Sequence, residues 1–460
     1  MSILSSISTS LALFCLGLSL TLTAQANTFE TVMANGMKVI VKEDKRAPTV
    51  VHMVWYRAGS IDEVNGKTGV AHVLEHMMFK GTKNLKPGDF SKKVAEVGGR
   101  DNAFTSKDYT AYFQQIEKSH LPKMMALEAE RLQHLRISEE EFKKEIQVVM
   151  EERRLRTDDQ AQAILYEQLL ANAFVNSPYR RPIIGWMDDL KNMTYRDAWQ
   201  WYQDWYAPNN AILVVAGDVD AKEVFRLAEQ YYGVVPSKKL PDRKPQEEIR
   251  QIGKKHITVK APAENQQLMM AWKVPKLEAN DLENIEPYAL AVLSGILDGY
   301  TNARLNKSMV KEQRLANSVD AYYEMSARGP QLFIIGASLS KQQQISVADQ
   351  AIRKALSEIA QKGVKDSELK RVQAQIISSQ IYKRDSVFAQ AMEIGMTEIV
   401  GISWREKDQI LERLQRVKSL DIQRVIQKYF IDDALTVAVL DPQPLAQSSQ
   451  PRATIPGGRH

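Results

Sequence analysis

The sequence predicts an α/β (α+β) fold made of two homologous domains, each a mixed β-sheet flanked by helices. The main evidence is an internal repeat, in which residues 211–218 of "NNAILVVAGDVD" match residues 434–441 of "DDALTVAVLDPQP" at a constant offset. In both copies a short polar turn leads into an apolar strand that ends in Asp. Each half also opens with strand-like alternation, marked in the first half by an Asn35-Gly36 hairpin signal, and continues into long helical stretches.

The domain boundaries follow from changes in composition along the chain. The segment "VVPSKKLPDRKPQEEIRQIGKK" between the two halves is rich in Pro and charge, which is typical of a linker. The final "PQPLAQSSQPRATIPGGRH" has a similar composition. We therefore expect a first domain at 27–236, a linker at 237–255, a second domain at 256–441 and a tail without fixed structure at 442–460.

Residues 1–26 differ from the rest of the chain and predict export. The apolar run "LALFCLGLSLTLT" is followed by the small-residue pattern "AQA", which is typical of a signal peptide cleaved before Asn27, although no Lys or Arg precedes the run. A membrane anchor is the alternative, but the run is short for a span. The single cysteine, Cys15, lies inside it, so the mature chain would contain none, which suits an oxidising compartment. The expected location is periplasmic or secreted.

Composition and charge narrow the class of protein. The chain has 460 residues, of which 44% are hydrophobic and 25% are charged, and this fits a globular protein large enough for two cores. The net charge of +5 is spread along the chain. Basic clusters such as "KKHITVK" are not interleaved with aromatic residues, so we expect no nucleic-acid partner.

The stretch "HVLEHMMFKGT" places two histidines and a glutamate in an apolar segment of helical length. Gly69 and Gly81 are candidate helix boundaries, and apolar residues cover nearly the whole circumference, so the helix should be buried. His72 and His76 project from one face a turn apart, with Glu75 near that face. Hydrogen-bonded core histidines are the alternative. Burial of two imidazoles and a carboxylate costs free energy, however, unless a partner satisfies their polar groups. The order His-x-x-Glu-His is also the inverse of the zinc motif His-Glu-x-x-His. The pattern therefore predicts metal binding.

A hydrolytic zinc site usually needs a third protein ligand, with the fourth position left for water. The best source is "SEEEFKKEIQVVMEERRLRTDD", where Ser138 and Glu141 form a capping box that starts a helix. Glu145 and Glu152 lie two turns apart on one face of this helix. Periodicity leaves both as candidate ligands, and a solvated charged face explains the other glutamates.

The complete set of motifs resembles the pitrilysin family of inverted-motif zinc peptidases, which includes insulin-degrading enzyme and the mitochondrial processing peptidases. The similarity rests on four features: "HVLEHMMFKGT", the glutamate at position 152 in "SEEEFKKEIQVVMEERRLRTDD", "GGRDNAFTSKDYTAYF" and "WYAPNNAILVVAGDVD". It implies a metallopeptidase half-chamber of the processing-peptidase type. By this resemblance His72, His76 and Glu152 would bind one zinc ion per chain, Glu75 would be the catalytic base, and Glu145 would support a zinc ligand.

The resemblance also implies how a peptide substrate binds and is cut. The segment around Asn102 and Ala103 would form a strand edge that pairs with the substrate backbone, and this favours unfolded peptides. A zinc ion would activate a water molecule whose proton Glu75 accepts. The chain is therefore expected to be a zinc metalloendopeptidase that acts on peptides.

One departure from the family pattern bears on partners. The family typically has an Arg and, seven residues later, a Tyr that help to hold the substrate carbonyl; we call this pair the carbonyl clamp. In "LNKSMVKEQRLANSVDAYY" the corresponding positions hold Val310 and Asn317, and the spacing of Lys311 and Arg314 argues against replacement by either. We therefore expect a heteromer with a homologous chain that carries the clamp, with a homodimer as the alternative.

Two classes of function are compatible with these motifs. The chain is either a zinc endopeptidase subunit or a catalytically silent structural subunit, since the family contains both. Silent members usually lose a metal-binding residue, and none is lost here. The sequence therefore favours the peptidase.

Overall fold

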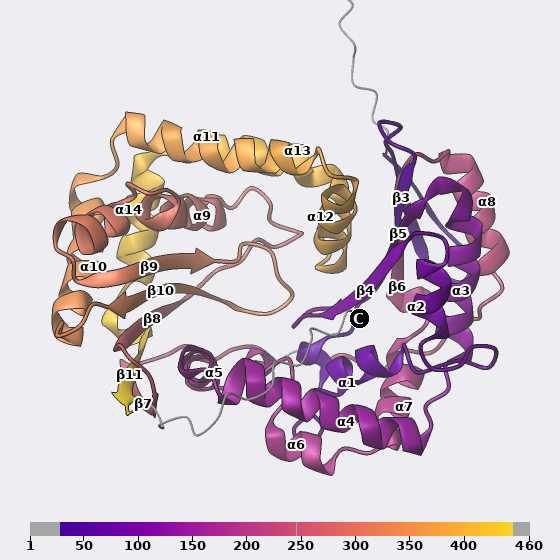
Figure 1. Cartoon of the computed structure of the whole chain (residues 1–460). Helices are drawn as coiled ribbons and strands as arrows, with labels where there is room; N and C mark the ends of the chain where they lie inside the picture. Colours follow the sequence, from indigo (N-terminus) through magenta and orange to yellow (C-terminus); the bar gives the residue numbers. More distant parts are fainter. Residues whose placement is uncertain (1–27, 245, 445–460) are drawn as a thin grey trace, which may run out of the picture.

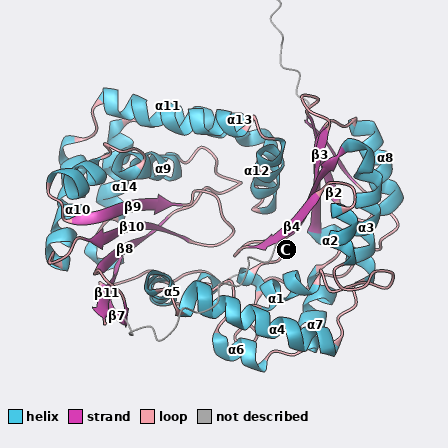
Figure 2. Ribbon diagram, in the orientation of Figure 1, coloured by secondary structure: helices cyan, strands magenta, loops and turns pink. Residues whose placement is uncertain are grey.

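The computed structural model describes residues 28–244 and 246–444, which form two similar domains side by side (Figure 1). Each domain has a mixed β-sheet flanked by helices, so the predicted fold class is confirmed (Figure 2). The expected signal peptide at 1–26 and residues 445–460 of the expected tail lie outside the described residues.

The first domain is built on a six-stranded sheet with the order β1-β2-β6-β3-β5-β4. Its strands are β1 (Thr28–Val32), β2 (Lys38–Glu43), β3 (Thr49–Tyr56), β4 (Arg100–Thr105), β5 (Thr110–Glu117) and β6 (Ala211–Gly217). The predicted hairpin joins β1 and β2 as an antiparallel pair, with Gly36 at a φ of 87° in the turn. Strand β6 runs parallel to β2 and antiparallel to β3.

The second domain repeats this topology in a five-stranded sheet with the order β7-β11-β8-β10-β9. Its strands are β7 (Lys255–Pro262), β8 (Gln267–Val274), β9 (Ala316–Tyr323), β10 (Gln331–Leu339) and β11 (Leu435–Gln443). Strand β11 is parallel to β7 and antiparallel to β8, as β6 is to β2 and β3. The two segments that match in the sequence are therefore the equivalent central strands β6 and β11.

Two details of the second domain differ from the expectation. Both halves open with strands, as expected from the alternation, but in the second half the first two strands, β7 and β8, do not form a hairpin, because β11 lies between them. They correspond to β2 and β3 instead. The last strand also continues past 441, because Pro442 and Gln443 are in register with Ala261 and Pro262 of β7.

The helices are arranged around the two sheets. Those of the first domain are α1 (Val70–Met77), α2 (Asp89–Ala95), α3 (Leu121–His134), α4 (Glu139–Arg153), α5 (Ala161–Ala173), α6 (Met187–Asn192), α7 (Tyr195–Trp205) and α8 (Ala221–Tyr231). Those of the second domain are α9 (Ile285–Asp298), α10 (Ile345–Lys362), α11 (Asp366–Lys383), α12 (Val387–Ile399), α13 (Lys407–Arg416) and α14 (Ser419–Tyr429). Strand side chains alternate between the two faces of a sheet, so β3 places Val54 and Tyr56 in the core under its own helices.

The opposite face of each sheet is covered by a helix from the other domain. Helix α12 packs against β3 and β6, with Ala391 buried beside Trp55. A Cβ atom at Gly395 would overlap the Trp55 indole, so the helix backbone lies directly on the sheet. Helix α5 in turn packs against β7, β8 and β11 through Leu165 and Leu169 (Figure 1). This reciprocal exchange of helices interlocks the two domains.

A buried polar contact also joins the domains near the end of β4. Arg328, in the loop between β9 and β10, donates to both carboxylate oxygens of Asp62 at 2.8 and 2.7 Å and to the Asp108 carbonyl at 2.8 Å. Asp108 lies in the turn between β4 and β5, and its carboxylate accepts from the Tyr179 hydroxyl. The N–H of Gly329 donates to that hydroxyl at 3.0 Å. The second domain therefore holds the turn that follows β4.

The segment expected to be a linker lies against the protein. Apart from residue 245, residues 237–254 are described and contain no helix or strand. Arg243 donates to Asp62 at 3.0 Å, and the Glu248 carboxylate accepts from the Ser177 N–H at 2.8 Å and pairs with Lys273 at 2.6 Å. These contacts tie the segment to both domains.

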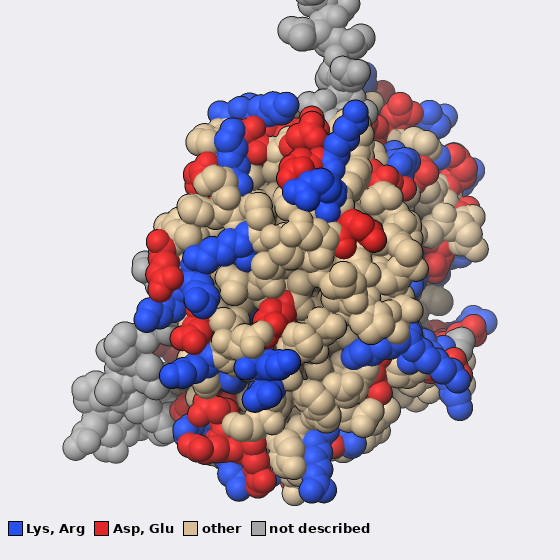
Figure 3. All heavy atoms as spheres, turned by 90° about the vertical axis from the view of Figure 1, so that its right-hand side faces the viewer, with Lys and Arg blue, Asp and Glu red and all other residues tan. Residues whose placement is uncertain are grey.

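Surface charges of both signs are interspersed on the face of the molecule shown in Figure 3, with uncharged surface between them. This view covers the side of the first domain that carries α3 and α8. Among the described residues, no helix combines the length and apolar character needed to cross a bilayer.

Candidate metal centre

Helix α1 starts from a tightly constrained backbone position. Gly69, at its N-cap, has a φ of 86°, and a Cβ atom there would overlap the Ile184 carbonyl. The N–H groups of Gly69 and Ala71 both donate to the buried Glu63 carboxylate at 2.9 Å. A carboxyl group at a helix N-terminus satisfies free amide N–H groups, and burial raises the pKa of Glu63 to about 8. The helix ends at Met77, one turn before the expected stop at Gly81.

The apolar side chains of α1 are buried as predicted, whereas its polar stripe lines a cleft. The buried residues of the helix are Val70, Ala71, Val73, Leu74 and Met77. His72, Glu75 and His76 open into a cleft of about 710 Å³, which we call the metal cleft. Its other walls are residues 102–105 of β4, the α4 residues Glu145, Val148 and Glu152, and Phe79, Lys80, Arg156, Thr157, Ile183 and Ile184.

Helix α4 supplies the carboxylates opposite α1. It begins after Ser138, whose hydroxyl accepts from the Glu141 N–H at 3.1 Å. The Glu141 carboxylate pairs with Lys144 at 2.9 Å. The α-helix ends at Arg153, and a π-helical turn at Arg154–Asp158 follows. Such turns are frequent at functional sites, and this one begins two residues after Glu152.

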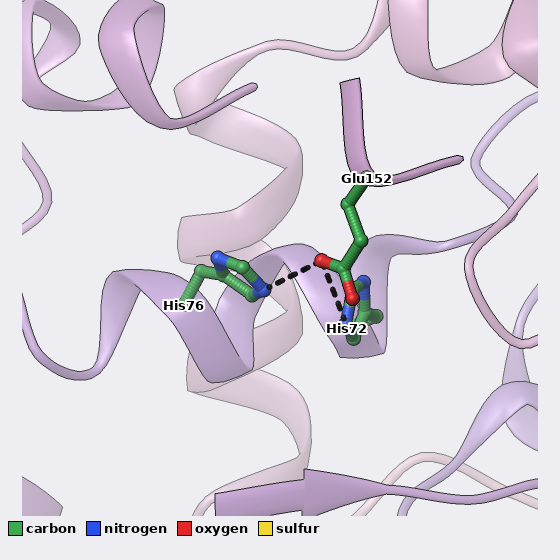
Figure 4. Close-up of side chains that lie close together, drawn as sticks. All are labelled: His72, His76 and Glu152. Carbon is green, nitrogen blue, oxygen red and sulfur yellow. Dashed lines mark ion pairs between the residues drawn. The ribbon is translucent and has the colours of Figure 1, made fainter. Parts of the chain in front are cut away.

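His72, His76 and Glu152 converge at one point (Figure 4). One ligand atom from each lies within 4.8 Å of the other two. The Glu152 Oε2 atom is 3.4 Å from His76 Nε2 and 3.8 Å from His72 Nε2. Two imidazoles and one carboxylate are the donor set of a catalytic zinc site that keeps one position open, so these residues fit a zinc ion.

Glu145, the other candidate on α4, lies outside this group of three. Its Oε1 atom is 2.8 Å from His76 Nδ1, and its Oε2 atom is 2.6 Å from Lys80 Nζ. Glu145 therefore holds the back of the His76 ring and directs Nε2 towards Glu152. A carboxylate in this position fixes the imidazole tautomer and raises its basicity as a ligand. No local pattern marks Lys80 as part of the site, although it stands in "FKGT" directly after the histidine motif.

The electrostatics of the group favour a cation. Burial, with a contribution from the neighbouring His76, lowers the pKa of His72 to about 4, so its ring is neutral. Burial opposes a charge on His76, but the hydrogen bonds to Glu145 and Glu152 outweigh this effect and raise its pKa. Burial likewise raises the pKa of Glu152, but contact with His76 reverses the shift and lowers it. Arg156 pairs with the second oxygen of Glu152 at 2.7 Å.

Glu75 lies beside the group of three and contacts β4. Its Oε2 atom accepts a hydrogen bond of 2.5 Å from the Thr105 hydroxyl. Burial raises the pKa of Glu75, and the Thr105 bond only partly opposes this shift. A raised pKa suits a carboxylate that must take and return a proton near neutral pH. Thr105 is a second residue that our sequence analysis did not assign, although it ends the quoted "NAFT".

Asn102 and Ala103 lie on β4, which is the edge strand of the first sheet and borders the metal cleft. The Asn102 side-chain oxygen accepts from the Ala103 N–H at 2.8 Å. The Asn102 side chain therefore occupies the Ala103 N–H group, which points away from the neighbouring strand β5. An edge strand with such groups is able to pair with an added strand.

The two positions of the missing carbonyl clamp lie elsewhere. Val310 is in the π-helical segment Asn306–Glu312, and Asn317 is on β9, where its amide donates to the Leu339 carbonyl at 3.2 Å. Lys311 donates to the Asn302 side chain at 2.7 Å. The described residues that line the metal cleft all come from 72–184, so the second domain contributes no side chain to it.

Family models match both halves of the chain. Residues 38–186 match the model described as "Insulinase (Peptidase family M16)", and residues 192–376 match "Peptidase M16 inactive domain". The first match contains α1 and α4, and with them the group of three.

Similar proteins occur in bacteria and in yeast. The chain is 32% identical over 447 residues to the "Zinc protease PqqE" of Helicobacter pylori, which covers 94% of this chain and 97% of that protein. It is 26% identical to a Schizosaccharomyces pombe protein named "Probable mitochondrial-processing peptidase subunit beta", covering 91% of this chain and 92% of that one.

Solved structures agree with these matches. A protease from Helicobacter pylori has a TM-score of 0.86 and 29% identity, over 91% of this chain and all of that one. The periplasmic protease PqqL of Escherichia coli shares the fold with a TM-score of 0.77 and 19% identity, over 95% of this chain and 52% of that longer one. With these similarities and a donor set that fits zinc, this chain belongs to peptidase family M16 and is a zinc metalloprotease.

Proposed function

We propose that the chain is an endopeptidase subunit that cuts unfolded peptides or oligopeptides, with one zinc ion held by His72, His76 and Glu152 and with Glu75 as the general base. The observation that carries this proposal is the position of Glu75. Its carboxylate stands in the same cleft as the three ligand residues and is hydrogen-bonded to Thr105 of the edge strand β4. Metal, base and peptide-binding edge are therefore brought to one place.

The roles of the residues follow from their contacts. A zinc ion, when bound, lowers the pKa of a water molecule and polarises the scissile carbonyl. Glu75 accepts a proton from the attacking water and passes it to the leaving amine. Thr105 holds the Glu75 carboxylate in position at 2.5 Å, and Glu145 orients His76 at 2.8 Å.

The substrate binds as an added strand along β4. A substrate carbonyl takes the place of the Asn102 side chain at the Ala103 N–H, which frees that side chain to contact the peptide. Recognition through main-chain hydrogen bonds needs an extended backbone. Unstructured peptides satisfy this requirement, and folded domains do not.

A second chain completes the site in this proposal. Among the described residues, none from the second domain lines the metal cleft, and Val310 and Asn317 replace the carbonyl clamp that the family resemblance implies. The similarity to PqqL covers only 52% of the PqqL chain, so this chain corresponds in length to about half of that protein. The partner is a homologous chain that carries the Arg and Tyr, and a homodimer is the alternative.

The first prediction concerns the metal. Purified protein binds one zinc ion per chain, and His72→Ala, His76→Ala or Glu152→Gln lowers the occupancy sharply because a direct ligand is lost. Glu145→Gln weakens zinc affinity by about 10- to 100-fold, since it only supports His76. Elemental analysis and competition with a chelator measure both effects. Glu151→Gln is the matched control, because Glu151 pairs with Arg154 at 2.8 Å on the same helix; loss of zinc in this variant contradicts the assignment.

The second prediction concerns catalysis. Glu75→Gln retains the zinc ion but reduces peptide hydrolysis by about 100- to 10,000-fold, which is the usual contribution of a general base. Hydrolysis of an unstructured fluorogenic peptide, with and without a chelator, measures the change. Wild-type rates in Glu75→Gln exclude Glu75 as the base. Zinc-loaded protein that cuts no peptide, alone or with its partner, favours a silent structural subunit.

The third prediction concerns the partner. The isolated chain is slow, because loss of one carbonyl donor costs about 100- to 1,000-fold in rate. Addition of a homologous chain that carries the clamp but lacks the zinc motif restores the rate without changing the zinc content. Light scattering and peptide assays on the separate and mixed chains test this. Full activity in a homodimer, unaffected by any partner, is the contrary result.

The fourth prediction concerns location. We propose export through the signal peptide at 1–26, so mature protein begins at or near Asn27 and is found in the periplasm of a Gram-negative host or in the medium. Cell fractionation and N-terminal sequencing measure this. Recovery of the chain from the membrane fraction with residues 1–26 attached indicates an anchored enzyme instead.

A further inference from the structure

A second cavity, of about 250 Å³, lies between the two domains next to the metal cleft. We call it the side cavity, and it shares Ile183 as a wall with the metal cleft. Its polar lining includes residues of the β4–β5 turn, of α5 and of the end of β9, among them Lys107, Tyr109, Tyr166, Tyr322 and Glu324. The cavity therefore continues the metal cleft beyond the end of β4.

The ammonium group of Lys107 has no polar partner among the described residues. It lies 4.9 Å from the centre of the Tyr179 ring. Burial lowers the pKa of Lys107 to about 8, and the neighbouring Asp108 opposes the shift only in part. The group is thus largely a cation at neutral pH, on a side chain that is half-buried in the cavity wall. A partly desolvated cation is stabilised by an anionic partner.

The acidic groups around the side cavity are already engaged. The Asp108 carboxylate accepts from the Tyr179 hydroxyl and from the Arg328 N–H, the latter at 3.1 Å. The Glu324 carboxylate accepts from the Tyr322 hydroxyl at 3.2 Å. The charge without a hydrogen-bonded partner in this cavity is therefore positive.

The position of the side cavity connects it to a bound peptide. Thr105 ends β4 and contacts Glu75, so the scissile bond of an added strand lies near the level of Thr105. Lys107 follows in the turn. An extended peptide advances about 3.3 Å per residue, so a substrate running past the end of β4 reaches Lys107 roughly two to four residues from the scissile bond.

We propose that the side cavity is a substrate subsite in which the Lys107 ammonium binds a carboxylate of the peptide, from an acidic side chain or from the peptide C-terminus. This inference rests on the proposed peptidase function. The subsite adds a preference for a peptide carboxylate, which main-chain pairing along β4 does not supply.

A binding assay tests the subsite without requiring turnover. Zinc-loaded Glu75→Gln protein is titrated with labelled unstructured peptides in which one Glu is moved along a fixed sequence, each beside its Gln counterpart. A second set compares free with amidated C-termini, which separates the two sources of the carboxylate. At one Glu position, or with the free C-terminus, we expect binding roughly five- to tenfold tighter than the uncharged counterpart. Wild-type cleavage rates on the same peptides should show the same preference.

Variants at position 107 identify the cation responsible. Lys107→Gln removes the preference, Lys107→Arg retains it, and Lys107→Glu reverses it in favour of peptides with Lys at the same position. Lys341→Gln, in an exposed loop, is the matched control and leaves the preference unchanged. Unchanged binding of the uncharged peptides by Lys107→Gln shows that the loss of preference in this variant is not a folding defect.

The possible failures are distinguishable. Equal binding of Glu and Gln peptides at every position, together with equal binding of free and amidated peptides, overturns the subsite. A preference that survives in Lys107→Gln overturns it as well. A Lys107-dependent binding preference in a protein that hydrolyses none of the peptides supports the subsite and contradicts the proposed function.

Discussion

The arrangement of the site depends on one constraint, the burial of three polar side chains on an otherwise apolar helix. His72, Glu75 and His76 are carried into the interior by the apolar residues between them, and burial alone disfavours a charge on each. The surrounding elements compensate for this cost at His76 and Glu75, because α4 provides two carboxylates to His76 and β4 provides the hydroxyl of Thr105 to Glu75. The same contacts that offset desolvation also direct the ligand atoms towards one point, so stability and function rest on the same bonds.

The interlocked domains explain why the edge of β4 faces a cavity. Helix α12 of the second domain covers the sheet face that carries Trp55, and α5 covers the second sheet in return. With both faces of the first sheet covered, its edge strand β4 remains available to another strand. Arg328 then fixes the turn after β4 through Asp62 and Asp108. The second domain therefore shapes the surroundings of the edge strand, although none of its described residues lines the metal cleft.

Several features were predictable because they depend on local periodicity. The apolar spacing of α1 places His72 and His76 one turn apart, and Ser138 starts α4 through its bond to the Glu141 N–H. The repeat around Ala211 and the later match near Leu435 revealed two equivalent strands. The bounds were less exact: α1 stops at Met77, and β11 extends to Gln443, because helix ends and strand ends are decided by contacts with distant segments.

The sequence by itself determined which residue types stand at helical spacing on α1 and α4, because that spacing follows from 3.6 residues per turn. Helical spacing alone leaves Glu145 and Glu152 equivalent, since two residues two turns apart on one helix share a face, and within the sequence only the family resemblance favours Glu152. The tertiary structure gives the physical distinction, by placing Glu152 between the two imidazole rings and Glu145 behind His76. The roles of Lys80, Thr105 and Lys107 also came from packing between segments that are distant in the sequence. Contacts of this kind have no local periodicity, so the order of residues along the chain does not reveal them.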